Sequence, residues 1–185
     1  GLVDTPYWTS TEALFAEELP SSLVVIGSSV VALEIAQAYA RLGSRVTILA
    51  RHTLLYAEDP LLGEKLAECF EKEGIRVLNN TQASHVSYDS NGFSLETNEG
   101  TLIAEKLLIS TGRHANTGKL GLENVGVETD KSGAIVVNSM METSTANIYA
   151  AGDCSNMPQF VYVAAAAGSR AGINMTGGNA QLDLS

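Results

Sequence analysis

The chain has 185 residues, of which 45% are hydrophobic and 17% are charged. This composition is typical of a globular protein and excludes a disordered chain, which needs low hydrophobicity together with dense charge. A formal net charge of -10, from 21 acidic and 11 basic residues, argues against a nucleic-acid partner, because phosphate-backbone binding needs clustered Lys and Arg.

The cysteine and histidine content limits the possible compartments and metal sites. Cys69 and Cys154 form no CxxC pair, which favours a reducing, cytoplasmic environment. The longest strongly apolar run, residues 160–167, is too short to cross a bilayer. The first four residues show no basic region followed by an apolar stretch, so no signal peptide is expected there. The three histidines show no ligand spacing, so no metal site is expected. The first residue is Gly1 rather than Met, so we expect the chain to begin inside a longer polypeptide.

The first half of the chain alternates short apolar runs with helical patterns. After a polar lead-in with a capped short helix near residues 9–15, the predicted elements are strands at 23–26, 45–49 and 75–78 and helices at 30–42 and 59–73. This βαβαβ order predicts a parallel sheet. In the first helix, apolar residues recur at helical spacing at Val31, Ile35, Ala38 and Leu42. In the second, one face is predicted to hold Leu62, Leu66, Cys69 and Phe70.

The pattern then changes to short alternating runs separated by Asn-Gly and Glu-Gly pairs. These runs, at 85–88, 93–97 and 101–104, predict an antiparallel meander. The later elements are predicted to be strands at 106–110, 134–137 and 147–150 and a helix at 161–175. The predicted fold class is therefore α/β.

The strongest local signal is the turn Gly27-Ser28-Ser29-Val30-Val31-Ala32 between a buried strand and a helix. Dinucleotide sites need Gly first for a tight turn, a small residue second for close approach of the pyrophosphate, and Gly or Ala third for helix packing. Gly27 and Ala32 fit, while Ser29 departs from Gly but remains small. The helix start would offer free amides to the pyrophosphate. The alternative is an ordinary Gly-Ser turn, and the βαβ context favours the dinucleotide site.

The end of the second strand indicates which dinucleotide binds. An acidic residue there would bind the ribose 2′-OH of NAD, but the position is occupied by Ala50, followed by Arg51 and His52. The planar fork of Arg51 suits a 2′-phosphate, so we expect NADPH rather than NADH. The alternative is that Arg51 is a solvated loop cation. Glu34, on the following helix, is either a surface residue or a neighbour of the nicotinamide.

Two further segments, residues 111–117 and 148–154, suggest a second ligand site. Asp153 follows a Gly at a predicted strand end, where a carboxylate can accept hydrogen bonds from a polyol. The next helix start can stabilise partial negative charge on a ring oxygen.

Together with the stretches at 27–34 and 159–168, these motifs make essentially the whole chain similar to the flavin-dependent pyridine nucleotide-disulfide oxidoreductases. The resemblance implies a Rossmann-like NADP-binding domain at 20–113, with parallel sheet and antiparallel β-meander. It also implies a connector at 1–19 and a partial FAD-binding domain segment, the C-terminal half, at 114–185. Within the family, the stretches most resemble members that reduce Hg(II) with NADPH through FAD.

The resemblance also assigns roles to single residues. It implies that Glu34 lies beside the nicotinamide, Ala83 lies near the adenosine and Gly112 approaches the dinucleotide through its backbone. It further implies that Asp153 binds the ribityl chain of FAD and that the backbone N–H of Val161 faces the flavin.

Several family features differ or are absent. Val30 stands where many relatives have a flavin-shielding Tyr, Ala115 replaces a Pro, and Ala57 replaces an Arg common in close relatives. The first ADP-binding motif, the CxxxxC redox pair and the interface domain are missing, so we expect no catalytic residue in this chain and a homodimer only for the intact enzyme. Two alternatives stay open: dihydrolipoamide dehydrogenase, which usually has Glu in place of Ala50, and a stand-alone NADPH-binding module, against which the Asp153 site argues.

Overall fold

The computed structural model describes residues 1–184. The chain forms two compact units, one of residues Gly1–Gly112 and a second that begins at Arg113. The order of helices and strands follows the predicted α/β pattern in the first unit. Each unit has its own hydrophobic core.

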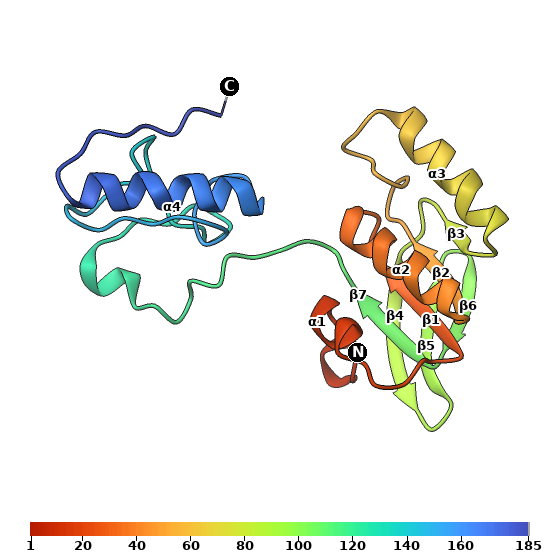
Figure 1. The fold of residues 1–185 in the computed structure, drawn as a ribbon. Helices are drawn as coiled ribbons and strands as arrows, with labels where there is room; N and C mark the ends of the chain where they lie inside the picture. Colours follow the sequence, from red (N-terminus) through yellow and green to blue (C-terminus); the bar gives the residue numbers. More distant parts are fainter. Residues whose placement is uncertain (185) are drawn as a thin grey trace. The chain divides into compact units, whose positions relative to one another are not determined.

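A four-stranded parallel sheet is the centre of the first unit (Figure 1). Its strands lie in the order β3-β2-β1-β7, and their bounds are β1 Ser22–Ile26, β2 Arg45–Leu49, β3 Arg76–Leu78 and β7 Lys106–Ile109. Because the strands are parallel, their carboxyl ends meet at one edge of the sheet. The predicted parallel sheet is therefore confirmed.

Helices α2 (Val30–Leu42) and α3 (Pro60–Lys72) pack on the parallel strands. Gly43 ends α2 with a left-handed backbone at φ 118°, as expected for a helix-terminating glycine. At the far ends of these helices, the Arg41 guanidinium bonds Glu73 at 2.7 Å. This hydrogen bond lowers the pKa of the Glu73 carboxyl below its ordinary value and joins α2 to the end of α3.

The apolar face predicted for α2 is buried only at Ile35. Val31, Ala38 and Leu42 are exposed, and the buried positions are Ala32, Leu33, Ile35, Ala36 and Tyr39. The helix is apolar on most sides, so two faces have helical spacing. The buried face includes two small residues, Ala32 and Ala36, which let the helix pack closely. The predicted face of α3 is also only partly correct, since Phe70 is buried and Leu66 half-buried while Leu62 and Cys69 are exposed.

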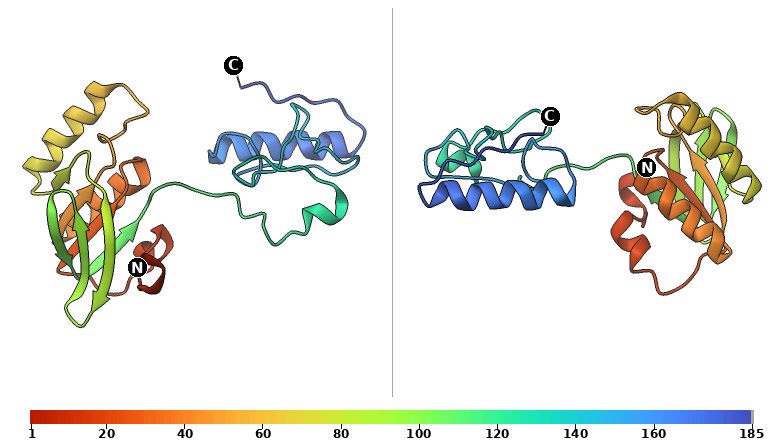
Figure 2. Two further views of the ribbon diagram at one scale, coloured as in Figure 1. Left: turned by 180° about the vertical axis from the view of Figure 1, so that it is seen from behind. Right: turned by 45° about the horizontal axis from the view of Figure 1, so that its top comes forward.

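A three-stranded antiparallel sheet covers the other face of the parallel sheet, giving three layers (Figure 2). Its strands are β4 (Ala83–Asp89), β5 (Gly92–Thr97) and β6 (Gly100–Ala104), which confirms the predicted meander. Successive side chains of β1 point alternately toward the meander and toward the helices, because side chains alternate along a strand. Val24 packs with the meander, whereas Leu23 and Val25 pack with the helices.

Residues 1–19 are fastened to this first unit. Trp8 pairs with β7: its N–H donates to the Leu107 carbonyl at 2.7 Å, and its carbonyl accepts from the Ile109 N–H at 2.8 Å. Helix α1 (Ser10–Leu14) begins with the expected capping box between Thr9 and Glu12. The segment therefore extends the parallel sheet by one bridge and includes the short 3₁₀ turn η1 (Leu2–Asp4).

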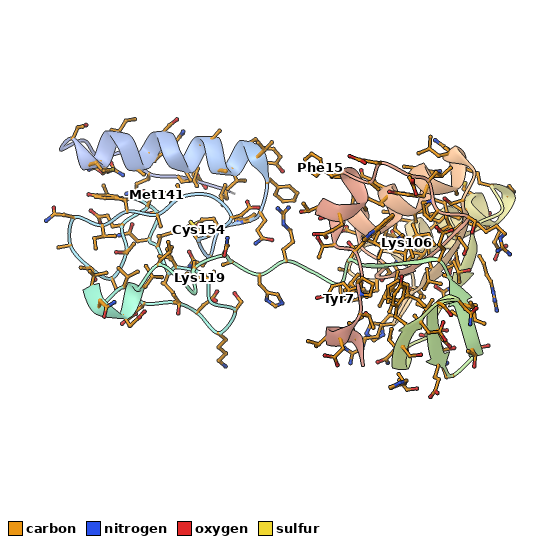
Figure 3. The ribbon with its side chains drawn as sticks, turned by 90° about the horizontal axis from the view of Figure 1, so that it is seen from below. Tyr7, Phe15, Lys106, Lys119, Met141 and Cys154 are labelled. Carbon is orange, nitrogen blue, oxygen red and sulfur yellow. The ribbon has the colours of Figure 1, made fainter. Side chains whose placement is uncertain are left out.

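The second unit packs loops against helix α4 (Val161–Met175), whose predicted bounds are confirmed. Met141 is fully buried in its core together with Ala167 and Ala171 (Figure 3). One short 3₁₀ turn, η2 (Leu122–Val125), precedes this core.

The two strands predicted at 134–137 and 147–150 are not continuous strands. Each segment forms only single β-bridges, Ile135 with Thr129 and Ser155, and Tyr149 with Glu142. Asn147, the first residue of the second segment, has a left-handed backbone at φ 63°, which is incompatible with an extended strand. An apolar run forms a strand only where a neighbour pairs with it along its length, and the described part of this unit offers pairing at isolated residues.

Candidate functional site

A cavity of about 650 Å³ lies in the first unit at the carboxyl edge of the parallel sheet. The last residues of three parallel strands, Ile26, Leu49 and Ile109, all line it. Its volume is in the range of small-molecule sites, and open α/β sheets bind ligands at this edge. The fold therefore places the cavity where a dinucleotide site is expected.

Gly27 forms the turn at the floor of this cavity. Its φ is 143°, and a Cβ at this position would overlap the carbonyl oxygen of Ser110 and lie 3.2 Å from the Cβ of Ala32. Both the backbone conformation and the close contact with the end of β7 therefore require glycine. Ala32 is completely buried at this crossing, which accounts for a small residue at the third motif position.

The start of α2 presents free amides at the same turn. Ser29 is the N-cap residue, and its side chain makes no capping hydrogen bond. The first backbone N–H groups of a helix have no partner within the helix, and the helix dipole makes this end partially positive. No acidic residue lies in the first turn of α2. This helix start can therefore bind an anion such as a pyrophosphate.

The loop after β2 forms a second wall and carries Arg51 and His52. Its backbone is anchored on both sides: the Leu55 N–H donates to the Ser28 carbonyl at 2.9 Å, and the His52 carbonyl accepts from the Asn80 N–H at 2.9 Å. Among residues 1–184, no carboxylate lies within ion-pair distance of Arg51. The backbone that carries Arg51 is thus anchored beside the cavity, and among residues 1–184 its guanidinium has no ion-pair partner, so it is available to an anionic ligand.

The start of β4 and the residues after β7 complete the lining. Ala83 lies at the cavity, as do Gln82, Ser84 and His85. Gly112 also lines it with φ 139°, and no heavy atom lies within 4 Å of where its Cβ would be. The backbone there is open to close approach by a ligand.

The cavity brings together seven of the predicted cofactor-binding residues: Gly27, Ser28, Ser29, Arg51, His52, Ala83 and Gly112. The other candidates of this unit lie outside its lining. Val30, Val31 and Glu34 are exposed on α2, and Ala32 and Ala50 are buried in the core. Three further lining residues, Tyr56, Gln82 and His85, carried no sequence signal, and Thr111, from the motif at 111–117, also lines the cavity.

Asp153 and Val161 belong to the second unit. Asp153 follows Gly152, whose φ of 87° turns the chain, and its carboxylate pairs with the Arg113 guanidinium at 3.2 Å. Sequence reasoning missed this pair, although each partner lies within one of the two motifs at 111–117 and 148–154. Val161 is 85% exposed and begins α4 without a side-chain cap on the preceding Phe160. A carboxylate and uncapped helix amides therefore lie in one unit.

Cysteine and acidic side chains form no further cluster in the described part of the chain. Cys69 and Cys154 are both free thiols. Within residues 1–184, no three His, Cys, Asp or Glu side chains are grouped as metal ligands would be. A helix with the length and hydropathy to cross a membrane is likewise not found among these residues.

The three-layer first unit, with its glycine turn at the helix start, defines an α/β dinucleotide-binding fold of the Rossmann-like class. The sequence model of one family, described as pyridine nucleotide-disulphide oxidoreductase, matches residues 2–168. The chain belongs to this family.

Two similar relatives are both mercuric reductases. The chain is 76% identical to a mercuric reductase of Shewanella putrefaciens over 185 residues, all of this chain and 33% of that protein. It is 61% identical to one of Acidithiobacillus ferrooxidans, covering 100% of this chain and 34% of the relative. The chain thus spans about a third of the length of these relatives.

Solved structures agree with the fold. The Cu(II) complex of the HOCl-induced flavoprotein disulfide reductase RclA from Escherichia coli matches with a TM-score of 0.91 and 30% identity, over 98% of this chain and 43% of that one. LpdA from Mycobacterium tuberculosis matches with a TM-score of 0.85 and 32% identity, over 95% of this chain and 39% of that one.

Proposed function

We propose that this chain is the NADPH-binding portion, together with half of the FAD pocket, of a flavoprotein that reduces Hg(II) with NADPH. The observation that carries the proposal is the cavity in which the Gly27 turn, the free amides of α2 and Arg51 are combined. The identities of 60–76% to mercuric reductases support the choice of reaction.

The cavity fits NADPH on three features. The Gly27 turn has no space for a side chain, so the pyrophosphate can approach the backbone and the start of α2. Gly112 leaves open space on the opposite strand end. Arg51 would bind the 2′-phosphate through paired N–H donors, with His52 beside it. When bound, NADPH supplies a hydride.

Recognition of the 2′-phosphate separates this proposal from the dihydrolipoamide dehydrogenase alternative. Ala50 is completely buried, and its N–H and carbonyl bond Leu78 and Thr81 at 2.9 Å each. The position therefore cannot bind a ribose hydroxyl through a side chain, as an acidic residue would. Arg51, one residue further on, supports NADPH as the donor.

The second unit fits part of an FAD site. One carboxylate oxygen of Asp153 bonds Arg113, which leaves the other oxygen able to accept hydrogen bonds from the ribityl hydroxyls. The N–H of Val161 at the uncapped start of α4 would face the electron-rich edge of the flavin. Bound FAD accepts and passes on an electron pair. Glu34 is proposed to lie beside the nicotinamide in the intact enzyme.

Hg(II) is the proposed substrate of the intact, homodimeric, cytoplasmic enzyme. A two-coordinate Hg(II) site needs paired thiols, and the two cysteines of this chain, Cys69 and Cys154, belong to different units. The thiols that contact the metal therefore belong to other parts of the intact enzyme, and no residue of this chain is assigned a catalytic role.

The 185-residue chain is expected to bind NADPH, to retain FAD poorly and to reduce no Hg(II). Calorimetric titration measures the first property, visible absorbance after gel filtration with FAD the second, and NADPH consumption with Hg(II) the third. A full-length mercuric reductase run in parallel is the positive control. A chain that stays yellow and consumes NADPH when Hg(II) is added would contradict the proposal.

A further inference from the structure

Tyr56 is an exposed aromatic residue in the wall of the cavity. It is 65% exposed, lines the cavity and lies in the same loop as Arg51. Its ring packs against His52, with centroids 5.1 Å apart and a tilt of 49°. Within residues 1–184, its hydroxyl has no hydrogen-bond partner. The side chain thus contributes little to the core, and its accessible ring borders the space where a ligand would lie.

The backbone of the loop around Tyr56 is held in place, and its ring contacts His52. Leu54 is 2% exposed and anchors the loop in the core. The N–H of Leu55 donates to the Ser28 carbonyl in the glycine turn, and the N–H of Glu58 donates to the Leu55 carbonyl at 2.8 Å. A tyrosine side chain has only two rotatable χ angles, so on an anchored backbone it loses little conformational entropy when it binds a ligand.

We propose that Tyr56, supported by His52, stacks on the adenine base of the dinucleotide and sets the affinity for adenine nucleotides. This inference rests on the proposed NADPH site. The adenine and the 2′-phosphate belong to one nucleoside, so the residue that binds the base must lie near Arg51, and Tyr56 is in the same anchored loop. An aromatic face stacks on a base without reading its edges. Arg51 then supplies the preference for the 2′-phosphate, and Tyr56 the binding of the base.

Three substitutions test the role of the ring. Tyr56→Ala and Tyr56→Leu remove it, Tyr56→Phe keeps it without the hydroxyl, and Leu61→Ala removes an exposed side chain that does not line the cavity. We expect Tyr56→Ala and Tyr56→Leu to weaken NADPH, NADH and 2′,5′-ADP alike, by about 5- to 100-fold. Tyr56→Phe and Leu61→Ala should stay within about twofold of the unchanged chain.

Two further readouts separate stacking from other causes. Reduced nicotinamide mononucleotide lacks the adenosine, so its binding should be the same in all variants. The adenine protons of 2′,5′-ADP should shift upfield on binding to the unchanged chain and to Tyr56→Phe, and lose this ring-current shift in Tyr56→Leu.

Unchanged affinities in Tyr56→Ala and Tyr56→Leu would overturn the inference, and so would a Tyr56→Phe variant as weak as Tyr56→Ala, because the hydroxyl would then be the contact. In either case, NADPH binding that still depends on Arg51 would leave the proposed function intact. Failure of the unchanged chain to bind NADPH would instead reject the proposed function itself.

Discussion

Replacing Gly27 with valine is expected to abolish NADPH binding and to destabilise the first unit by about 2–5 kcal/mol. The new Cβ would overlap the Ser110 carbonyl oxygen, and the positive φ of 143° is strained for any residue with a side chain. The turn would have to move away from β7, which displaces the start of α2. Urea unfolding measures the loss of stability, and calorimetric titration measures NADPH binding.

Gly100→Val is the matched control for this substitution. Gly100 also has a positive φ, of 100°, but no heavy atom lies within 4 Å of where its Cβ would be. The control isolates backbone strain, with an expected cost of about 1–3 kcal/mol, and should bind NADPH normally. If Gly27→Val were no less stable than Gly100→Val and still bound NADPH, the close contact at Ser110 would not be the reason for glycine.

The second large effect is expected from Arg51→Gln, which should weaken NADPH by about 10- to 100-fold and leave NADH unchanged. A hydrogen bond between charged groups contributes about 1.5–3 kcal/mol, and tenfold in affinity corresponds to about 1.4 kcal/mol. Arg51 has no carboxylate partner among residues 1–184, so its removal should not disturb the fold. Titrations with both dinucleotides measure the change in preference.

Arg45→Gln is the control for the loss of one positive charge. Arg45 is the exposed first residue of β2, and Arg51 lies two residues after its last residue, Leu49. The two arginines therefore lie at opposite ends of the strand. The control should bind both dinucleotides as the unchanged chain does. Equal weakening of NADPH and NADH by Arg51→Gln would show that this residue does not recognise the 2′-phosphate.

Elements with local signals could be predicted from the sequence. The bounds of α2 follow from the Gly-Ser turn before it and Gly43 after it, and α4 ends before a Gly pair. The role of Gly27 in the turn was also predictable, because a helix that follows directly on a buried strand needs a tight turn. Local backbone chemistry determines these features, and tertiary packing does not override it.

Features that depend on packing could not be predicted in the same way. The apolar face predicted for α2 is buried only at Ile35, because apolar residues surround the helix and packing on the sheet determines that Ala32 and Ala36 are buried. The predicted strands of the second unit needed neighbours along their whole length. Tyr56 and His85 come to the cavity from a loop and from β4, and no spacing along the chain connects them.

Backbone amide NMR of the isotope-labelled chain, titrated with NADPH and with NADH, tests most directly whether the first-unit cavity is the NADPH site. Large amide shifts are expected at Gly27, Ser29 and Gly112 with both dinucleotides, and a large shift at Arg51 with NADPH alone. These residues lie in the Gly27 turn, at the start of α2, after the end of β7 and in the loop after β2. Shifts confined to residues outside the cavity, or an Arg51 response identical for NADPH and NADH, would contradict the assignment.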